Sequence, residues 1–257
     1  MLFFIHVIII ISGLTNYKIK DGRIIMFEKV RTRRVYMDIV EQIQQLIKKG
    51  KLKPGDMLPP ERILAEQLGV SRPPLREALA ALEILGLIES RGGKGNIIKN
   101  NFDSSWYKKQ LKELEKEDSP FEILEARKAV ETQIAALAAK KATKEDIKSI
   151  QESLDKMRSL MGKVPEVMKA DREFHTNIAI AAHNCVLLSI VSYLSQGLKE
   201  RLWVKLKEKS WGISERAERY LREHKIILDA IKNKDDKVAS RAMYNHLSSV
   251  EKDLLNE

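Results

Sequence analysis

The sequence predicts a mainly α-helical fold in two parts, a small N-terminal unit that ends in a β-hairpin and an all-helical C-terminal domain. Two observations lead to this prediction. Apolar residues recur at helical spacing along most of the 257 residues. Between residues 87 and 100, the run LIESRGGKGNIIKN instead places two short β-like segments around a Gly-Gly turn. The chain is long enough for two domains, each with its own core.

The composition is that of a globular protein with excess positive charge near its N-terminus. Hydrophobic residues make up 44% of the chain, charged residues 32%, and the formal net charge is +10. Residues 26–100 hold 14 basic against 9 acidic side chains, which favours a polyanionic partner such as DNA. The single cysteine, Cys185, excludes an internal disulfide framework. Because it lies in the apolar run CVLLSIVSYL, we expect a buried thiol and a reducing, cytoplasmic location.

The first residues, MLFFIHVIIIISGL, are apolar but do not read as a membrane span. The run is too short to cross a bilayer as a helix, and it lacks the features of a signal peptide. Met26 opens a segment that resembles a natural start. We therefore interpret residues 1–25 as a mis-assigned or disordered leader outside the fold and expect no membrane partner. The alternative is a genuine membrane-associated leader.

Residues 26–100 read as a winged helix-turn-helix. One helix is predicted by apolar residues every four positions, namely Val35, Ile39, Ile43 and Ile47. After a Gly- and Pro-rich break comes a short helix with Pro60 at its start and Gly69 just past its end. A second helix begins after Ser71, a plausible N-cap, and is ended by Gly86. Two helices joined by a tight turn and followed by a hairpin define this motif. Residues 101–118 read as a linker with some helical content.

A helix-turn-helix places the N-terminal side chains of its second helix against base edges. In this sequence the corresponding residues are Ser71, Arg72, Pro74 and Arg76. Arginine can bind guanine through two hydrogen bonds, and Arg62, at the start of the preceding helix, suits a phosphate. The hairpin tip adds residues that can approach the DNA backbone, namely Arg91, Gly92, Gly93 and Lys94. The alternative is a set of solvated surface charges.

The stretch KLKPGDMLPPERILAEQLGVSRPPLREALAALEILGLIESRGGKG resembles the N-terminal domain of the GntR family of bacterial transcription regulators. The resemblance covers Tyr36 to about Lys99 essentially without gaps. It implies that Arg62, Arg72 and Arg76 contact operator DNA, and that the wing around Gly92 reaches the minor groove.

Residues 119–257 show only helical periodicity, in about six segments, and hold a candidate metal site. Asp171 and His175 share one helix face, because they are four residues apart. His224 and His246 each lie in a separate amphipathic helix among inward-facing apolar residues. Buried imidazoles need partners, so the four residues form either one metal site or a set of separately satisfied core side chains.

This second half resembles the FCD domain, an all-helical bundle that follows the GntR winged helix in one subfamily. The resemblance implies that Asp171, His175, His224 and His246 bind a divalent metal ion, with zinc preferred over nickel or manganese. A small carboxylate effector would fill the open positions of the ion. Arg127 would pair with the effector's carboxylate, or would instead form a surface salt bridge with Glu131.

Together these features predict a ligand-responsive transcription regulator, a repressor that binds operator DNA as a homodimer. We expect no enzyme, because no positioned base accompanies the candidate metal site. The alternative is a structural DNA-binding protein whose bundle only dimerises.

Overall fold

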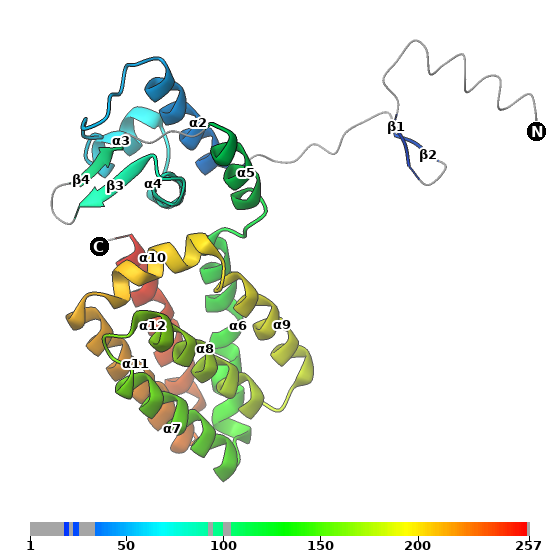
Figure 1. Cartoon of the computed structure of the whole chain (residues 1–257). Coiled ribbons are helices and arrows are strands. Elements are labelled where there is room, and N and C mark those ends of the chain that lie inside the picture. Colours follow the sequence, from blue (N-terminus) through cyan, green and yellow to red (C-terminus); the bar gives the residue numbers. More distant parts are fainter. Residues whose placement is uncertain (1–17, 21–22, 26–33, 92–94, 100–103, 256–257) are drawn as a thin grey trace, which may run out of the picture. The chain divides into compact units, whose positions relative to one another are not determined.

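The computed structural model describes residues 18–20, 23–25, 34–91, 95–99 and 104–255 (Figure 1). The chain divides into two compact units, Met1–Arg33 and Arg34–Glu257. In the first unit, β1 (Lys18–Lys20) and β2 (Arg23–Ile25) pair as an antiparallel hairpin that the sequence analysis does not predict. The rest of the leader segment, residues 1–17 and 21–22, lies outside the described residues.

The second unit begins with a winged helix-turn-helix, in the predicted order. Its three helices are α2 (Val35–Lys48), α3 (Glu61–Leu68) and α4 (Arg72–Ile84). Two antiparallel strands follow, β3 (Ile88–Arg91) and β4 (Gly95–Ile98). Helix α4 packs against α2, α3 and β3, so three other elements of the winged helix-turn-helix, which we call the head, hold the predicted recognition helix.

The turn between α3 and α4 depends on particular backbone conformations. Gly69 ends α3 in the left-handed region, with φ of 65°, where a residue without Cβ is favoured. Ser71 occupies the N-cap position of α4, but its side chain forms no capping hydrogen bond. The reason is that Pro73 and Pro74 fill the second and third positions of the helix, and neither has the N–H that a cap would accept. Ser71 is at the predicted boundary but does not cap the helix.

Helix α2 is rotated relative to the face that its apolar spacing predicts. Val35 is exposed and Ile47 is only partly buried, whereas Tyr36 and Val40 are fully buried together with Ile43. The prediction that Val35 lies on the core face is therefore wrong. The Tyr36 hydroxyl donates a hydrogen bond of 2.8 Å to the carbonyl of Leu114, which gives this side of α2 a polar anchor that the apolar pattern does not reveal.

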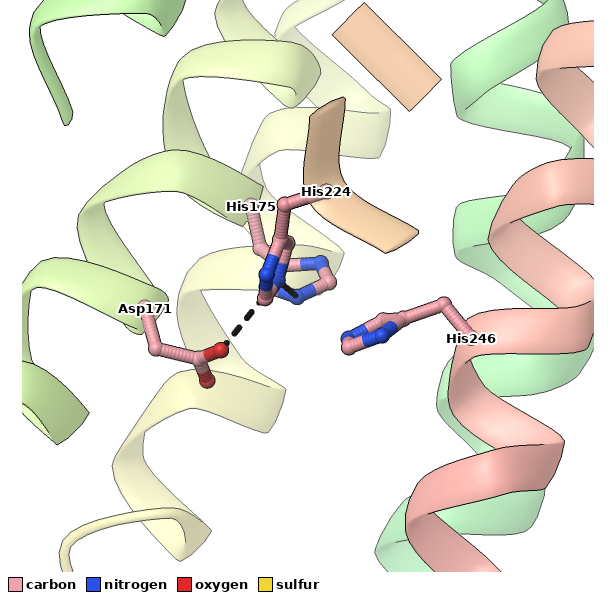
Figure 2. A group of neighbouring side chains, drawn as sticks. All are labelled: Asp171, His175, His224 and His246. Carbon is pink, nitrogen blue, oxygen red and sulfur yellow. Dashed lines mark hydrogen bonds and ion pairs between the residues drawn. The ribbon is translucent and has the colours of Figure 1, made fainter. Parts of the chain in front are cut away.

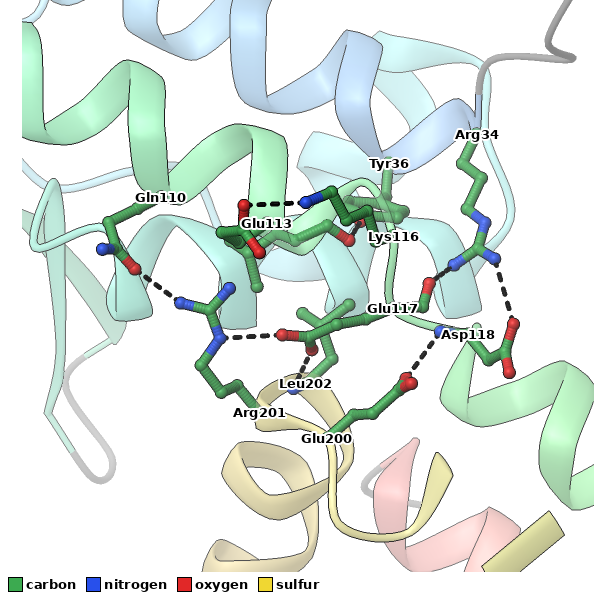
Figure 3. Close-up of polar contacts among 11 residues, drawn as sticks. Arg34, Tyr36, Gln110, Glu113, Lys116, Glu117, Asp118, Glu200, Arg201 and Leu202 are labelled. Carbon is green, nitrogen blue, oxygen red and sulfur yellow. Dashed lines mark hydrogen bonds and ion pairs between the residues drawn. The ribbon is translucent and has the colours of Figure 1, made fainter. Parts of the chain in front are cut away.

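The linker contains helix α5 (Ser104–Leu114) and then a short segment anchored by Glu117 (Figure 3). One carboxylate oxygen of Glu117 lies 2.7 Å from Arg201 Nε. The other accepts a hydrogen bond of 3.0 Å from the backbone N–H of Leu202. Glu117 therefore satisfies an N–H at the start of the distant helix α10 (Arg201–Trp211). The N-cap residue of α10, Glu200, forms no side-chain cap. The Glu200 carboxylate instead accepts from the N–H of Asp118, at 2.6 Å.

Seven helices follow among the described residues from position 120 onward, one more than predicted. They are α6 (Pro120–Lys141), α7 (Lys144–Ser159), α8 (Val164–Ala181), α9 (Cys185–Gly197), α10 (Arg201–Trp211), α11 (Ser214–Lys232) and α12 (Asp236–Leu254). The missed boundary lies at residues 198–200, between α9 and α10. The sequence there, Leu-Lys-Glu, contains no proline or glycine, and the helix start depends on the distant Glu117.

The bundle is held by an apolar core and by long antiparallel helix pairs. Helix α12 packs along α6, α7 packs along α8, and α11 packs along α12 (Figure 1). The core is made mainly of alanine, leucine and isoleucine side chains, which allow the helices to approach closely. Within the described part of the chain, no helix is long and apolar enough to cross a membrane. The arrangement places α8, α11 and α12 so that all three contribute to one buried polar cluster.

Candidate metal centre

Four predicted ligands meet inside the bundle. Asp171 and His175 come from α8, His224 from α11 and His246 from α12, and Figure 2 shows their side chains pointing toward one another. One ligand atom from each residue lies within 4.8 Å of all the others. The four residues are between 0% and 5% exposed. The structure therefore brings together all four residues of the predicted set.

Two glutamates outside this set orient the imidazole rings. His246 Nδ1 hydrogen-bonds to Glu223 at 2.9 Å, and His175 Nδ1 faces Glu131 Oε2 at 2.6 Å. A ring nitrogen that faces a carboxylate carries the proton, which leaves the lone pair on the opposite nitrogen, Nε2. His224 Nε2 lies 3.5 Å from His175 Nε2. His175 and His246 therefore each have an unprotonated Nε2 available as a ligand.

The electrostatics of the cluster favour the protonation states that a metal ion requires. Burial lowers the pKa of His224 and holds that of His246 well below its usual range, so both rings are neutral at pH 7. Burial alone would raise the pKa of Asp171, but the contact with His224 and the charge of Lys207 keep it well below its usual range. A carboxylate and neutral imidazoles are the forms that coordinate metals.

The donor set fits a divalent metal ion. Asp171 Oδ1 is buried, lies 3.2 Å from His224 Nε2 and has no hydrogen-bond partner among the described residues. One carboxylate oxygen and imidazole nitrogens suit zinc, nickel or manganese. With at most four protein ligands, an ion that prefers six would retain open positions for another molecule.

The sequence leaves two partners open for Arg127, an effector carboxylate and Glu131. The structure shows the contact with Glu131, and it lies inside the bundle. Its Nε lies 2.6 Å from Glu131 Oε1, and both side chains are buried rather than on the surface. Burial would raise the pKa of Glu131, but the adjacent Arg127 and His175 lower it to about 2. Glu131 thus connects Arg127 to a metal-site histidine, a role that the sequence analysis does not assign to it.

The predicted DNA-binding residues that the structure describes lie on the head. Two of them, Arg72 and Arg76, also contact the bundle. Arg62 is exposed on α3, 3.4 Å from Glu66, and Arg91 pairs with Glu89 at 2.9 Å. Arg76 forms an ion pair with Glu61. Ser71 is the N-cap residue of α4, and Arg72, Pro74 and Arg76 lie in its first two turns.

Arg72 and Arg76 also contact the last helix of the bundle. Arg76 donates a hydrogen bond of 3.0 Å to the carbonyl of Leu254, and Arg72 donates to the carbonyl of Leu255. The C-terminal end of a helix carries partial negative charge, which attracts guanidinium groups. The wing-tip residues Gly92, Gly93 and Lys94 lie outside the described residues.

His183 and Cys185, which follow the α8 ligands in the sequence, lie outside the metal cluster. His183 has a φ of 46°, just beyond the end of α8, and its Nε2 lies 2.8 Å from Asp146, so it joins α8 to α7 instead of entering the cluster. Cys185 is exposed, which contradicts the expectation of a buried thiol. It is the first residue of α9, and its neighbour Val186 is exposed as well. The apolar run therefore does not imply burial at its first positions.

Comparisons with known proteins agree with this arrangement. The profile of the gntR family of bacterial regulatory proteins matches residues 35–98, and that of the FCD domain matches residues 122–249. The Uxu operon transcriptional regulator of Escherichia coli (strain K12) is 37% identical, over 86% of this chain and 87% of the relative. The HTH-type transcriptional regulator LutR of Bacillus subtilis (strain 168) is 36% identical, over 80% of this chain and 94% of the relative.

A solved structure, Streptococcus agalactiae GntR, is 24% identical with a TM-score of 0.45, over 85% of this chain and 99% of that chain. The two family matches and the two regulators of Escherichia coli and Bacillus subtilis define a DNA-binding transcription regulator, not an enzyme. The chain belongs to the GntR family and carries a C-terminal FCD domain.

Proposed function

We propose that this regulator is a repressor that senses a small carboxylate through a divalent metal ion bound in its FCD domain. The observation that carries the proposal is the buried cluster of Asp171, His175, His224 and His246. Four buried polar side chains from three helices are costly unless they share a partner, and a metal ion satisfies all of them at once. The contacts of Glu131 and Glu223 with two of the rings are the outer shell that such an ion needs.

The effector would be bound by groups of the chain together with the ion. A metal ion supplies Lewis-acidic positions for carboxylate oxygens. Arg127 would add hydrogen bonds to the same carboxylate, because a guanidinium has five N–H donors and Glu131 accepts from only two of its nitrogens. Effector binding changes DNA affinity only if the effector binds the DNA-bound and DNA-free conformations unequally.

The DNA contacts would come from the head. Arg62, Arg72, Arg76 and Arg91 are proposed to meet phosphates and base edges, with Ser71, Pro74 and the wing residues Gly92, Gly93 and Lys94 beside them. The Ser71 hydroxyl supports this assignment, since it forms no capping bond and remains available for a phosphate.

We further propose that the protein acts in the cytoplasm as a homodimer on a palindromic operator. Helix α9 exposes three apolar side chains on successive turns, Val186, Ile190 and Tyr193. Such a strip supports self-association, because isolated monomers rarely expose aligned apolar residues. We propose the domain limits 26–100 for the winged helix, 101–118 for the linker and 119–257 for the effector-binding and dimerisation domain.

Metal analysis of the purified full-length protein tests the proposal. We expect about one divalent ion per chain, and a change in DNA affinity when a small carboxylate is added to the metal-loaded protein. A protein that purifies without metal and binds no added zinc would favour the alternative, a DNA-binding structural protein whose bundle only dimerises.

A further inference from the structure

Lys207 is a buried cation that forms no ion pair with any acidic side chain among the described residues. It lies on α10 and is only 2% exposed. Its Nζ lies 4.4 Å from the centroid of the Tyr220 ring and 5.8 Å from that of Trp211. Within the described part of the chain, no side chain forms an ion pair or a hydrogen bond with this ammonium group. A buried charge that is held only by aromatic rings keeps three N–H donors unused, which is costly.

The position of Lys207 is next to the metal centre. The Tyr220 ring, which lies against the ammonium, is 5.9 Å from the His246 ring between centroids. One turn earlier on α10, Trp203 lies 5.9 Å from the guanidinium of Arg127. The charge of Lys207 also contributes to the low pKa of Asp171. Helix α10 therefore directs Lys207 toward the side of the bundle that contains the proposed effector site.

The carboxylates near Lys207 are engaged elsewhere. Asp253 pairs with Arg219 and accepts from the Tyr220 hydroxyl, at 2.5 Å. Glu223 is bonded to His246, and Asp171 belongs to the metal cluster. Their charges act on the ammonium from a distance and raise the pKa of Lys207.

Lys207 keeps its charge in this environment. Burial lowers its pKa to about 8, so most of the amine is still protonated at pH 7. A divalent ion at the cluster would add further positive charge nearby, of which Asp171 supplies the only carboxylate compensation among the four ligands. A second negative group beside Lys207 would therefore be favourable when the site is complete.

We propose that Lys207 binds a second carboxylate of the effector, so that the ligand class is a small dicarboxylate rather than a monocarboxylate. This inference rests on the proposed function, in which the first carboxylate is bound at the metal and by Arg127. Lys207 then sets specificity, because a ligand without a second negative group leaves the buried ammonium unpaired.

The first test separates this role from a structural one. In the ligand-free, zinc-loaded protein, Lys207→Met should leave the melting temperature unchanged or raise it, since replacing an unpaired buried charge by an apolar side chain removes a cost. A large fall in melting temperature would show that Lys207 holds the bundle together and would overturn the proposal. Zinc content should stay at the wild-type value.

The second test measures ligand preference by calorimetric titration of the same protein. Succinate and butyrate have equal chain length but two and one carboxylates, and malonate and propionate form a second such pair. We expect wild type to prefer the dicarboxylate of at least one pair by about tenfold or more, and Lys207→Met to lose that preference. Lys207→Arg should retain it in part. Lys209→Met, on the same helix but half-exposed and paired with Glu83, is the matched control and should behave as wild type.

The outcomes distinguish the two proposals. If wild type prefers a dicarboxylate and Lys207→Met prefers it equally, the assignment of Lys207 is wrong and carboxylate sensing stands. If wild type prefers monocarboxylates, the dicarboxylate class is wrong. If the zinc-loaded wild type binds none of the four acids, both the proposed effector class and this inference fail.

Discussion

Arg76, in the predicted recognition helix, donates a hydrogen bond of 3.0 Å to the backbone carbonyl of Leu254, near the end of the last helix of the bundle. Its neighbour Arg72 donates to the next carbonyl, that of Leu255. Burial lowers the pKa of Arg76, an effect that its ion pair with Glu61 opposes. The arginines that would contact DNA thus have protein partners in this conformation, and they must exchange them for DNA when the regulator binds its operator.

The first prediction concerns these arginines. Arg72→Ala and Arg76→Ala should each weaken binding to a DNA fragment selected by the wild-type protein, by about tenfold or more. The slope of log affinity against log salt concentration should become shallower, because fewer phosphates are neutralised. Fluorescence anisotropy at several salt concentrations measures both quantities. The exposed Arg158 on α7 supplies a control, and Arg158→Ala should bind DNA like wild type. Unchanged affinity of both α4 variants at low and physiological salt would contradict the assignment.

The second prediction concerns metal binding. His224→Ala and His246→Ala should each lose bound zinc, because each removes one of four ligands inside the bundle. His183→Ala is a matched control, since His183 is half-exposed and outside the cluster, and it should keep wild-type zinc content. Elemental analysis after dialysis gives the stoichiometry. Chelation should lower the melting temperature of wild type and of the control variant, because a ligand that binds only the native state stabilises it. Equal zinc content in all three variants would exclude the cluster as the binding site.

The metal ligands could be predicted from the sequence because helical periodicity shows which face of its helix each ligand occupies. Asp171 and His175 share a face by spacing, and the apolar neighbours of His224 and His246 indicate that both helices pack inward. Which atoms of separate helices then meet is a tertiary property. For that reason the glutamates that orient the rings, Glu131 and Glu223, could not be identified before the structure.

Other features depended on contacts between distant segments. The start of α10 is satisfied by Glu117 of the linker, more than eighty positions earlier, so the local sequence marks the boundary only by Gly197, the last residue of α9. Lys207 reads as one of many lysines in a basic amphipathic segment, and only its burial against Tyr220 distinguishes it. Cys185 shows the reverse case, in which an apolar run predicts burial and the helix instead exposes its first turn. The order of apolar and polar residues shows the periodicity of a helix, but the segments packed against the helix decide which of its faces is buried.

The third prediction concerns the buried pair of Arg127 and Glu131. Glu131→Ala should lower the free energy of unfolding by about 3–5 kcal/mol, because it leaves a guanidinium buried without its partner. The double variant Arg127→Met with Glu131→Met should recover much of this loss, since two apolar side chains of similar volume replace the ions. Urea denaturation of the metal-free protein measures both effects without a contribution from bound zinc. A double variant that is less stable than Glu131→Ala would show that the pair stabilises the bundle beyond mutual neutralisation.

The fourth prediction concerns the pH dependence of stability at Glu77. This α4 side chain is buried, accepts a hydrogen bond from Ser119 and lies within the field of Arg34 and Glu122. Burial raises its pKa from 4.5 to about 7. Between these values the native state keeps a proton that the unfolded state has lost, so stability falls as pH rises through this window and levels off above it. Glu77→Gln removes this cost. At pH 8 the variant should therefore exceed wild type by up to about 3 kcal/mol, at roughly 1.4 kcal/mol for each pKa unit.

At pH 5 the difference between the variant and wild type should shrink to about 1 kcal/mol or less, because Glu77 is then protonated in the native state and only its unfolded carboxyl loses the proton. The comparison is made by urea denaturation at pH 5, 6, 7 and 8. Histidines and other titrating groups are common to both proteins, so their contributions cancel in the difference at each pH. A difference that stays constant across the series, or that favours wild type at pH 8, would show that Glu77 is ionised in the native state at every pH tested and that Arg34 compensates for its burial.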